Sequence, residues 1–555
     1  MNDRAPPRWI LPSLLLLAVA VRLFAWSRAA MMMNDGPDFL WQAEQLLAGD
    51  VRAMLAHPYH PLYGALAAAF ALLTGSVLSG ALCVSVASGV ALVGTSWWLA
   101  RRLLPAERWL PVAAGLLAAI SARATQYGAD IQSDGLATAL WLLGLAALLA
   151  AWQAARPTNT ASRERSTRVS DSELAASPQA ASSSAPRVHV GALLLAGVFT
   201  GLGYLTRPEV LALGLPALAV VLACRGVAGR VRAAVAYGVP LLVLLLPYVF
   251  AMHTETNTWG LSLKPSLQLS GLSSAPFVHQ APPDSPLGSP VAWRDRSRAP
   301  ERPLTGAARR DAEATEAMEH NPPATRDAGM SLLAVRGEPV ARAAAAALDD
   351  FVHAARLELL LLAIVGVAAL RRRRNALLGP TCFAWCCWMS VVVAQLALVG
   401  YATNRHLLPA IVVLLPISGV GLLHLARGGT LLRVLLALLL LEGLRAGTEE
   451  QRQDHWGRLE ALAWVAEHTP EGARFATHRR RDAWYAQRPI LVTQMPVNDA
   501  DFQALITEHN VQTFVFDERR LLEHHPDWPT KKNLIEVARF GQGEDVALVL
   551  RPTTP

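Results

Sequence analysis

The chain has 555 residues, of which 53% are hydrophobic and only 17% are charged, and its mean hydropathy is +0.29. This composition is too apolar for a soluble protein of this size, so most of the chain is expected to lie in a lipid bilayer. The net charge of +7 comes almost entirely from arginines, many of which flank apolar runs, so it indicates membrane topology and predicts no nucleic-acid partner.

About eleven apolar stretches are long enough for transmembrane helices when the short ones are judged with their flanks. In chain order they lie near residues 9–28, 78–100, 109–127, 135–153, 189–205, 208–224, 233–251, 352–370, 377–400, 407–425 and 430–446. The first could pass for a signal peptide, but Arg22 interrupts its apolar run and no clear cleavage site follows. We therefore expect a retained first helix.

A further apolar segment, from Pro61 to Thr74, has only about 14 residues, which is the length of an interfacial or re-entrant helix. We expect it to stay on the outer face, since a crossing there would place the acidic first loop and the arginines near residue 101 on one side of the membrane.

The arginines gather in the loops near residues 101–108, 225–232, 371–374 and 427–433, which are therefore expected to be cytoplasmic. The alternate loops carry most of the acidic residues and are expected outside. With an odd number of spans and a cytoplasmic N-terminus, the C-terminus lies outside. The prediction is thus a multi-pass protein of the cell inner (plasma) membrane with a periplasmic or extracellular C-terminus.

Three stretches do not have the composition of membrane spans. Residues 154–188 read as a disordered cytoplasmic linker. Residues 253–350 form an outer loop, whose middle from Pro282 to Pro323 is expected to have little fixed structure before an amphipathic helix near Val340 to Leu357. Residues 447–555 follow the transmembrane domain of residues 1–446 as a soluble tail.

The tail alternates helical and strand patterns, which predicts a small α/β domain outside the membrane. The expected helices cover residues 454–468 and 499–509, and the expected strands cover residues 474–477, 490–493, 512–516 and 546–550. The predicted fold class is therefore an α-helical polytopic membrane protein with a small C-terminal α/β domain.

The first outer loop, residues 29–77, carries two carboxylates directly after a helix end, Asp35 and Asp38, and two histidines beside prolines, His57 and His60. Together these residues provide a general base and cationic groups in one loop. The alternative is that Asp35 and Asp38 only solvate the end of a helix, because charges are common at membrane interfaces.

Later outer loops add Asp134, then Arg207 with Glu209, then Arg405 with His406. Each has a simpler interpretation. Asp134 could only cap the helix that follows it, Arg207 could only pair with Glu209, and Arg405 could be an interfacial anchor. A divalent metal held by Asp35, Asp134 and a histidine is possible by ligand type, although no tight ligand spacing supports it. The five cysteines lie in apolar segments and are expected to be buried small hydrophobes.

The order of these motifs resembles that in the GT-C glycosyltransferases of the protein-mannosyltransferase and aminoarabinose-transferase type, which are similar to glycosyltransferase family 39. Asp35 stands four residues before Phe39, Gly49-Asp50 closes the next helix, and His60-Pro61 holds the place of a basic-Pro motif. Asp134 lies in a loop similar to the family's second outer loop. Residues 201–209, ending in Arg207-Pro208-Glu209, and residues 404–409 around Arg405 resemble two later motifs. The sequence departs from the usual pattern at Gly36 and His60.

The resemblance implies an enzyme that transfers a sugar from a polyprenyl-phosphate donor to a lipid, glycan or protein acceptor on the outer face, with inversion. It implies an aspartate base, carried here to Asp35 with Asp38 as the alternate, and Asp134 as a further catalytic candidate. The candidates for binding the substrate and its phosphate are His57, His60, Arg207, Glu209, Arg405 and His406. The metal requirement stays open.

Two other classes of function compete with this interpretation. A transporter or flippase of lipid-linked or envelope precursors would place ionisable residues near the middle of its spans, whereas here the spans carry few charges and the polar residues gather at one face. A receptor or scaffold that uses its soluble tail would not need so many spans. The sequence therefore favours the glycosyltransferase.

Overall fold

The computed structural model describes residues 6–155, 189–224, 226–256, 259–262, 278–279, 337–372, 377–399, 404–449, 455–479, 481–488, 490–492, 499–525, 534–543 and 545–553. The expected linker lies outside these residues from position 156 onward, and so does the proline-rich segment from Pro282 to Pro323.

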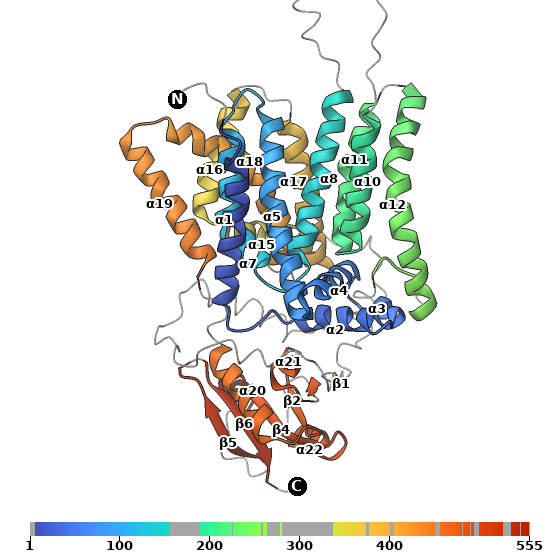
Figure 1. Cartoon of the computed structure of the whole chain (residues 1–555), viewed down its shortest axis with the longest axis vertical. Helices are drawn as coiled ribbons and strands as arrows, with labels where there is room; N and C mark the ends of the chain where they lie inside the picture. The colour runs from blue at the N-terminus through green and yellow to red at the C-terminus, as the bar shows by residue number, and fades with distance from the viewer. Residues whose placement is uncertain are drawn as a thin grey trace, which may run out of the picture.

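A bundle of long helices forms the larger part of the molecule, and a small sheet domain lies beyond one end of it (Figure 1). The helices of the bundle are α1 (Ile10–Ser27), α5 (Val77–Leu103), α6 (Leu110–Ile120), α7 (Ala122–Gly128), α8 (Asp134–Ala155), α10 (Val190–Tyr204), α11 (Gly214–Ala223), α12 (Gly226–Thr256), α16 (Leu357–Arg372), α17 (Leu378–Val399), α18 (Leu408–Ala426) and α19 (Thr430–Gly447). Their facing sides bury one continuous apolar core, while leucines and valines on the outer sides of α1, α12 and α19 stay exposed. This distribution is that of a bundle solvated by lipid.

Among the described residues, six helices are long and apolar enough to cross a membrane, namely α1, α5, α8, α12, α17 and α18 with the turn before it. The bent pair α15 (Gly337–Ala355) and α16 would make a seventh. The protein is therefore a multi-pass membrane protein. The remaining predicted spans are helices that are shorter (α6, α10 and α11) or that are not among those apolar enough to cross (α19). The count of about eleven spans therefore stays a prediction.

Two predicted spans are not single straight helices. Residues 109–127 break at Ser121, where ψ is 124° and α6 ends before α7 begins. Arg22 of α1 is fully buried and donates to the carbonyls of Ala118 and Ala119 at the end of α6 and to the carbonyl of Ala124 in α7. An apolar residue in place of Arg22 would leave these buried carbonyls without its hydrogen bonds.

The second broken span is the one expected at residues 352–370. The helix turns by 102° between α15 and α16 at Arg356, whose φ of 65° lies in the left-handed region. The guanidinium group of Arg356 donates to Glu358 and Glu442, so two ion pairs hold the bend. The amphipathic helix expected near Val340 to Leu357 is confirmed as α15.

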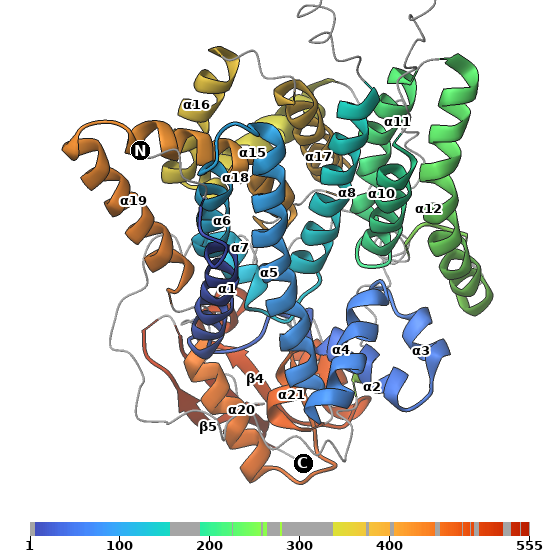
Figure 2. The ribbon, with the colours of Figure 1, turned by 45° about the horizontal axis from the view of Figure 1, so that its top comes forward.

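Three short helices lie across the lower end of the bundle in Figure 1, between the bundle and the sheet domain, and Figure 2 shows them beside the same end of α5. They are α2 (Gly36–Leu47), α3 (Val51–Ala56) and α4 (Leu62–Thr74). The segment expected to be too short to cross forms α4, and it lies with α2 and α3 rather than along the bundle.

The C-terminal domain contains α20 (Trp456–His468), α21 (Asp482–Ala486), α22 (Asp499–Thr507) and α23 (Glu518–His524) around a mixed sheet. The strands lie in the order β1 (Val278–His279), β3 (Ile490–Val492), β2 (Arg474–Thr477), β4 (Val511–Asp517), β6 (Ala547–Pro552) and β5 (Leu534–Phe540). Strands β3, β2 and β4 are parallel, and the other pairs are antiparallel. The predicted α/β character is confirmed.

The patterns of the tail predicted two helices and four strands, and the structure has all six near the expected residues. It also has α21, α23 and β5, which were not predicted, and β1, which comes from the long loop after α12 and pairs with β3.

Candidate functional site

The loop between α1 and α2 places Asp35 at the first turn of α2. Asp35 directly precedes the helix, and Pro37 is its second residue, within the first turn, where the N–H that proline lacks would have no partner in the helix. Phe39, one turn further, is buried and packs its ring against Tyr59 and Tyr63, with centroids 5.2 and 4.8 Å apart. This contact folds residues 57–63 back over α2 and brings Tyr59 to Asp35.

Asp35 has two polar partners from distant parts of the chain. Its Oδ1 accepts a hydrogen bond of 2.7 Å from the hydroxyl of Tyr59. Its Oδ2 accepts a hydrogen bond of 2.5 Å from Nη1 of Arg405, which lies 370 positions later at the turn before α18. The side chains of Asp35 and Arg405 stay 17% and 15% exposed, so the pair is desolvated in part but still reachable. Arg405 is therefore more than an interfacial anchor.

Asp38 lies on the buried side of α2, and only 1% of its side chain is exposed. Its Oδ1 is 3.4 Å from Nε2 of His57, and the ring of His57 stacks on Tyr59 with centroids 5.4 Å apart. Asp38 and His57 thus form a pair beneath the surface on which Asp35 lies. The more accessible of the two carboxylates is Asp35.

A second cluster joins Asp134, Arg207 and His406. Nη1 of Arg207 forms an ion pair with Asp134 at the start of α8, its Nε lies 3.6 Å from Glu209, and its Nη2 lies 3.3 Å from Nε2 of His406. His406 is also 3.1 Å from the side-chain amide of Gln395 on α17. Arg207 is therefore not paired with Glu209 alone, and the side chain of Asp134 binds a cation rather than only capping α8.

The two clusters meet at one narrow pocket. It is lined by Asp134, Ala137, Thr138, Arg207, Glu209, Trp388, Val391, Val392, Gln395, Arg405, His406 and Pro409. Arg405 belongs to the first cluster through its pair with Asp35, and it lines this pocket together with the residues of the second cluster. Its lining combines apolar side chains with two guanidinium groups and two carboxylates, and guanidinium groups are the side chains that bind anions most strongly.

His60 is held apart from this pocket. It is buried between the rings of Tyr204 and Tyr248, with centroids 5.0 and 5.2 Å away. It does not line the pocket, so the structure brings together Asp35, Asp134, Arg207, Glu209, Arg405 and His406, and places Asp38, His57 and His60 around them.

Three residues of the site were not predicted from the sequence. Tyr59 lies inside the motif that carries His57 and His60, so an aromatic hydroxyl beside Asp35 could have been suspected. Gln395 and Trp388 lie in an apolar span, where a lone amide and an indole carry no local signal. Within the part of the chain that the structure describes, no group of three or more metal-ligating side chains gathers.

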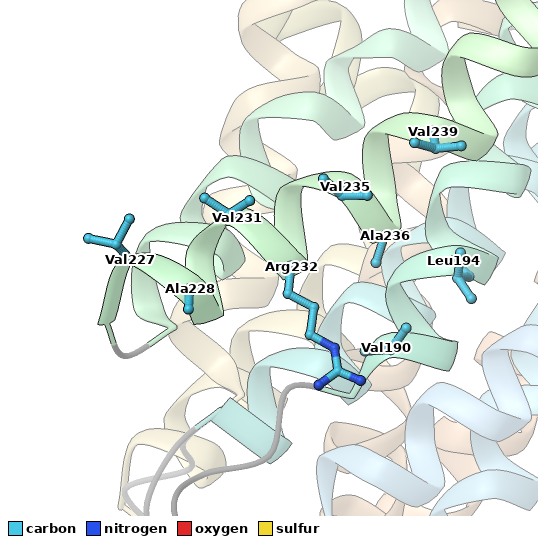
Figure 3. A pocket seen from close by; sticks show the side chains of 9 residues that line it. All are labelled: Val190, Leu194, Val227, Ala228, Val231, Arg232, Val235, Ala236 and Val239. Carbon is cyan, nitrogen blue, oxygen red and sulfur yellow. The ribbon is translucent and has the colours of Figure 1, made fainter.

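A wider groove lies between α10 and α12 near their ends away from the site (Figure 3). Its residues are Val190, Leu194, Val227, Ala228, Val231, Arg232, Val235, Ala236 and Val239. The valines of α12 recur every four residues and are half exposed or more, as expected of a helix side that faces lipid. The described residues that line this groove include one cation and no carboxylate, so we assign the chemistry to the narrow pocket.

Comparison with solved structures finds similar folds at low sequence identity. ArnT from Cupriavidus metallidurans in the apo state has a TM-score of 0.51 and 13% identity, and the match covers 97% of each chain. The same protein bound to undecaprenyl phosphate has a TM-score of 0.43 and 14% identity, with 97% of each chain covered. The oligosaccharyltransferase of Archaeoglobus fulgidus in the apo form has a TM-score of 0.49 and 13% identity, covering 93% of this chain and 70% of that one.

No protein-family model matches the sequence, and no curated protein does. The likeness to apo ArnT extends over nearly the whole of both chains, and it confirms the GT-C-like fold that the motifs predicted. The chain is thus a polytopic membrane protein with a GT-C-like fold.

Proposed function

We propose that this protein is a membrane glycosyltransferase that moves a sugar from a polyprenyl-phosphate donor to a hydroxyl of a lipid, glycan or protein acceptor. The observation that carries the proposal is the pairing of Asp35 with Arg405 at the edge of a pocket that also holds Arg207 and His406. Such a transfer needs a carboxylate that can accept a proton from the acceptor, and cationic groups that can stabilise the charge on the departing phosphate.

In the proposed reaction Asp35 takes the proton of the acceptor hydroxyl, and the acceptor oxygen attacks the anomeric carbon of the donor. The bond from this carbon to the phosphate oxygen breaks, and the configuration inverts because attack and departure occur on opposite faces. The lipid phosphate leaves with the electron pair, and its charge is stabilised by Arg207 and Arg405, with His406 held beside them by Gln395.

We also propose that this site lies on the outer face of the inner membrane. In Figure 1 the N-terminus lies near one end of the bundle, and α2 and the C-terminal domain lie at the other. A reporter fused after Pro555 is expected outside, and a cytoplasmic reporter would contradict the orientation.

The deciding experiment uses membranes that contain equal amounts of folded wild type, Asp35→Asn or Asp38→Asn, supplied with a broad set of radiolabelled polyprenyl-phosphate sugars. We expect wild type to consume a donor, and Asp35→Asn to be slower by about 10² to 10⁴, the usual worth of a general base. An Asp349→Asn variant, changed at an exposed carboxylate of α15, serves as the matched control and should keep full activity.

Loss at Asp38 with full activity in Asp35→Asn would move the base by three residues, to the buried carboxylate beside His57. If wild type consumes no donor of the set, the enzyme proposal fails.

A further inference from the structure

The C-terminal domain contacts the backbone directly before the proposed base. Tyr485 on α21 accepts a hydrogen bond of 2.8 Å through its hydroxyl from the backbone N–H of Met32. Arg481, just before α21, donates through Nη1 to the carbonyl of the same residue at 3.1 Å. All three side chains are buried. Both backbone groups of one loop residue are thus bound by side chains that come about 450 positions later in the chain.

The transmembrane domain binds the backbone of the next loop residue, Met33. The backbone N–H of Met33 donates to Oδ1 of Asp130 at 3.2 Å, and the same oxygen accepts from the N–H of Ile131 at 2.8 Å. The side chain of Met32 packs on the first turn of α2, because a Cβ at Gly36 would lie only 2.8 Å from its Sδ. Residues 32 and 33 are therefore fixed from both domains, two to three positions before Asp35.

The segment that carries Arg481 and Tyr485 is itself anchored. Asp482, the first residue of α21, is fully buried, and its carboxylate accepts from Nε of Arg458 at 3.0 and 3.1 Å. Thr477 at the end of β2 donates to the same carboxylate. A helix of five residues has little stability of its own, so these bonds are what fix its orientation. The contact with Met32 is consequently built on a rigid support.

We propose that Arg481 and Tyr485 are positioning residues, which hold the loop so that Asp35 keeps its place between Tyr59 and Arg405. This inference rests on the proposed function, and it assigns the C-terminal domain a part in the reaction although none of the residues that the structure describes in this domain lines the pocket. A shift of about 1 Å in a reacting group can cost on the order of 10² in rate, so even a small loosening of the loop is measurable.

The first test is the rate of amide hydrogen exchange, which does not depend on any reaction. In the full-length protein, Tyr485→Phe removes one hydroxyl and keeps the ring. We expect faster exchange in the peptide that spans residues 28–40 and no change in the spans. Tyr237→Phe, which removes a hydroxyl bonded to Thr200 inside the bundle, is the matched control and should leave that peptide unchanged. Unchanged exchange in Tyr485→Phe would overturn the inference.

The second test separates positioning from binding. Tyr485→Phe and Arg481→Gln are expected to lower kcat by about tenfold to a hundredfold while the KM for the donor stays the same, because Arg207 and His406 lie on other elements. Arg481→Lys keeps a donor for the carbonyl of Met32 and should recover part of the loss. Arg488→Gln is the control, since Arg488 also donates to backbone carbonyls, but within its own domain.

The outcomes are distinguishable. Faster exchange around Met32 with an unchanged kcat would show that the contact exists but does not position the base, which overturns the proposal. An equal loss in Arg488→Gln would overturn it too, because the effect would then be one of domain stability. A wild type that consumes no donor would defeat the proposed function and the role in it, while the exchange data would still establish whether the contact forms.

Discussion

Two arginine–carboxylate clusters, one in the C-terminal domain and one at the end of the bundle, use the same chemistry in different ways. In the C-terminal domain, Arg458 is 0% exposed and donates to Asp482, Asp517, Thr477 and the carbonyl of Val515, all within that domain. At the bundle, the pairs Asp35–Arg405 and Asp134–Arg207 come from four separate segments and border a pocket.

The two clusters differ in the exposure of their central ion pair to solvent. Burial alone would raise the pKa of Asp517, but the charges of Arg458 and Arg479 outweigh it and hold this pKa well below its usual range. The central pair of this cluster, Arg458 and Asp482, is 0% exposed, so its hydrogen bonds serve to offset the cost of burying charge. The other cluster keeps Asp35 and Arg405 partly exposed beside a pocket, where a ligand can exchange for existing partners. We therefore read the first as structural and the second as functional.

The largest effect should come from breaking the cluster in the C-terminal domain. Asp482→Asn leaves Arg458 buried with a weaker partner, and removing one member of a buried pair typically costs about 3–5 kcal/mol. We expect the free energy of opening β2 and β4, measured by native-state hydrogen exchange in the full-length protein, to fall by about this amount, with the spans unaffected.

The matched control is Glu523→Gln, which breaks the exposed pair Glu523–Arg519 in the same domain. An exposed pair contributes about 0–1 kcal/mol, so the opening free energy should hardly change. If Asp482→Asn costs no more than this control, the cluster does not stabilise the domain.

A smaller effect, and one on rate rather than stability, is expected from Arg405→Gln. Removing one group that stabilises charge in a transition state costs about 10² to 10³ in kcat, or roughly 2.7–4 kcal/mol. Asp35 keeps its hydrogen bond from Tyr59, so the loop should remain folded. Donor turnover and thermal unfolding, measured on the same purified samples, check the two halves of this prediction.

Arg427→Gln provides the comparison at the other end of α18, where Arg427 pairs with Glu107 of the loop between α5 and α6. It removes an interhelical ion pair without touching the pocket, so turnover should stay near that of wild type. Equal losses of turnover in the two variants would mean that Arg405 acts through the stability of the bundle.

The strands and spans could be predicted from sequence because their signal is local. The strand expected at residues 474–477 is found as β2, and the first and fourth spans are found as α1 and α8. The break at Ser121 could not be predicted, because the carbonyls at the end of α6 are bound by Arg22, about 100 positions earlier. Strand β5 was missed because charged residues interrupt its apolar pattern.

The candidate site likewise has a part that could be predicted from local sequence and a part that could not. Asp35, Arg207 and Arg405 could be named from motifs, but their contacts could not, since Asp35 and Arg405 are 370 positions apart. Tyr485 and Arg481 lie in a run of basic and aromatic residues that gives no sign of this contact, and only the packing of α21 against the loop after α1 brings them to Met32. Local patterns thus identified the residue types, and tertiary structure decided the partners.

The smallest effect of a single side chain is that of each buried histidine on the pH dependence of the C-terminal domain. Burial lowers the pKa of His455 and His478 well below the usual value of 6.5, helped by Arg479 at the first and Arg458 at the second. The unfolded chain therefore binds more protons than the folded one below about pH 6.5, and stability falls as the pH falls. Each histidine contributes a slope of up to about 1.4 kcal/mol per pH unit, while Asp517 adds a loss only below its usual pKa of 3.8.

Native-state hydrogen exchange of β2 and β4 between pH 7.5 and 5, corrected for the intrinsic exchange rate, measures this slope. His455→Gln should remove about half of it, whereas His509→Gln, outside the cluster, should leave it intact. If the slope is the same in His455→Gln as in wild type, His455 takes up its proton while the domain is folded. The cluster would then be open to solvent ions like the one at the pocket, and the distinction between a structural and a functional cluster would no longer hold.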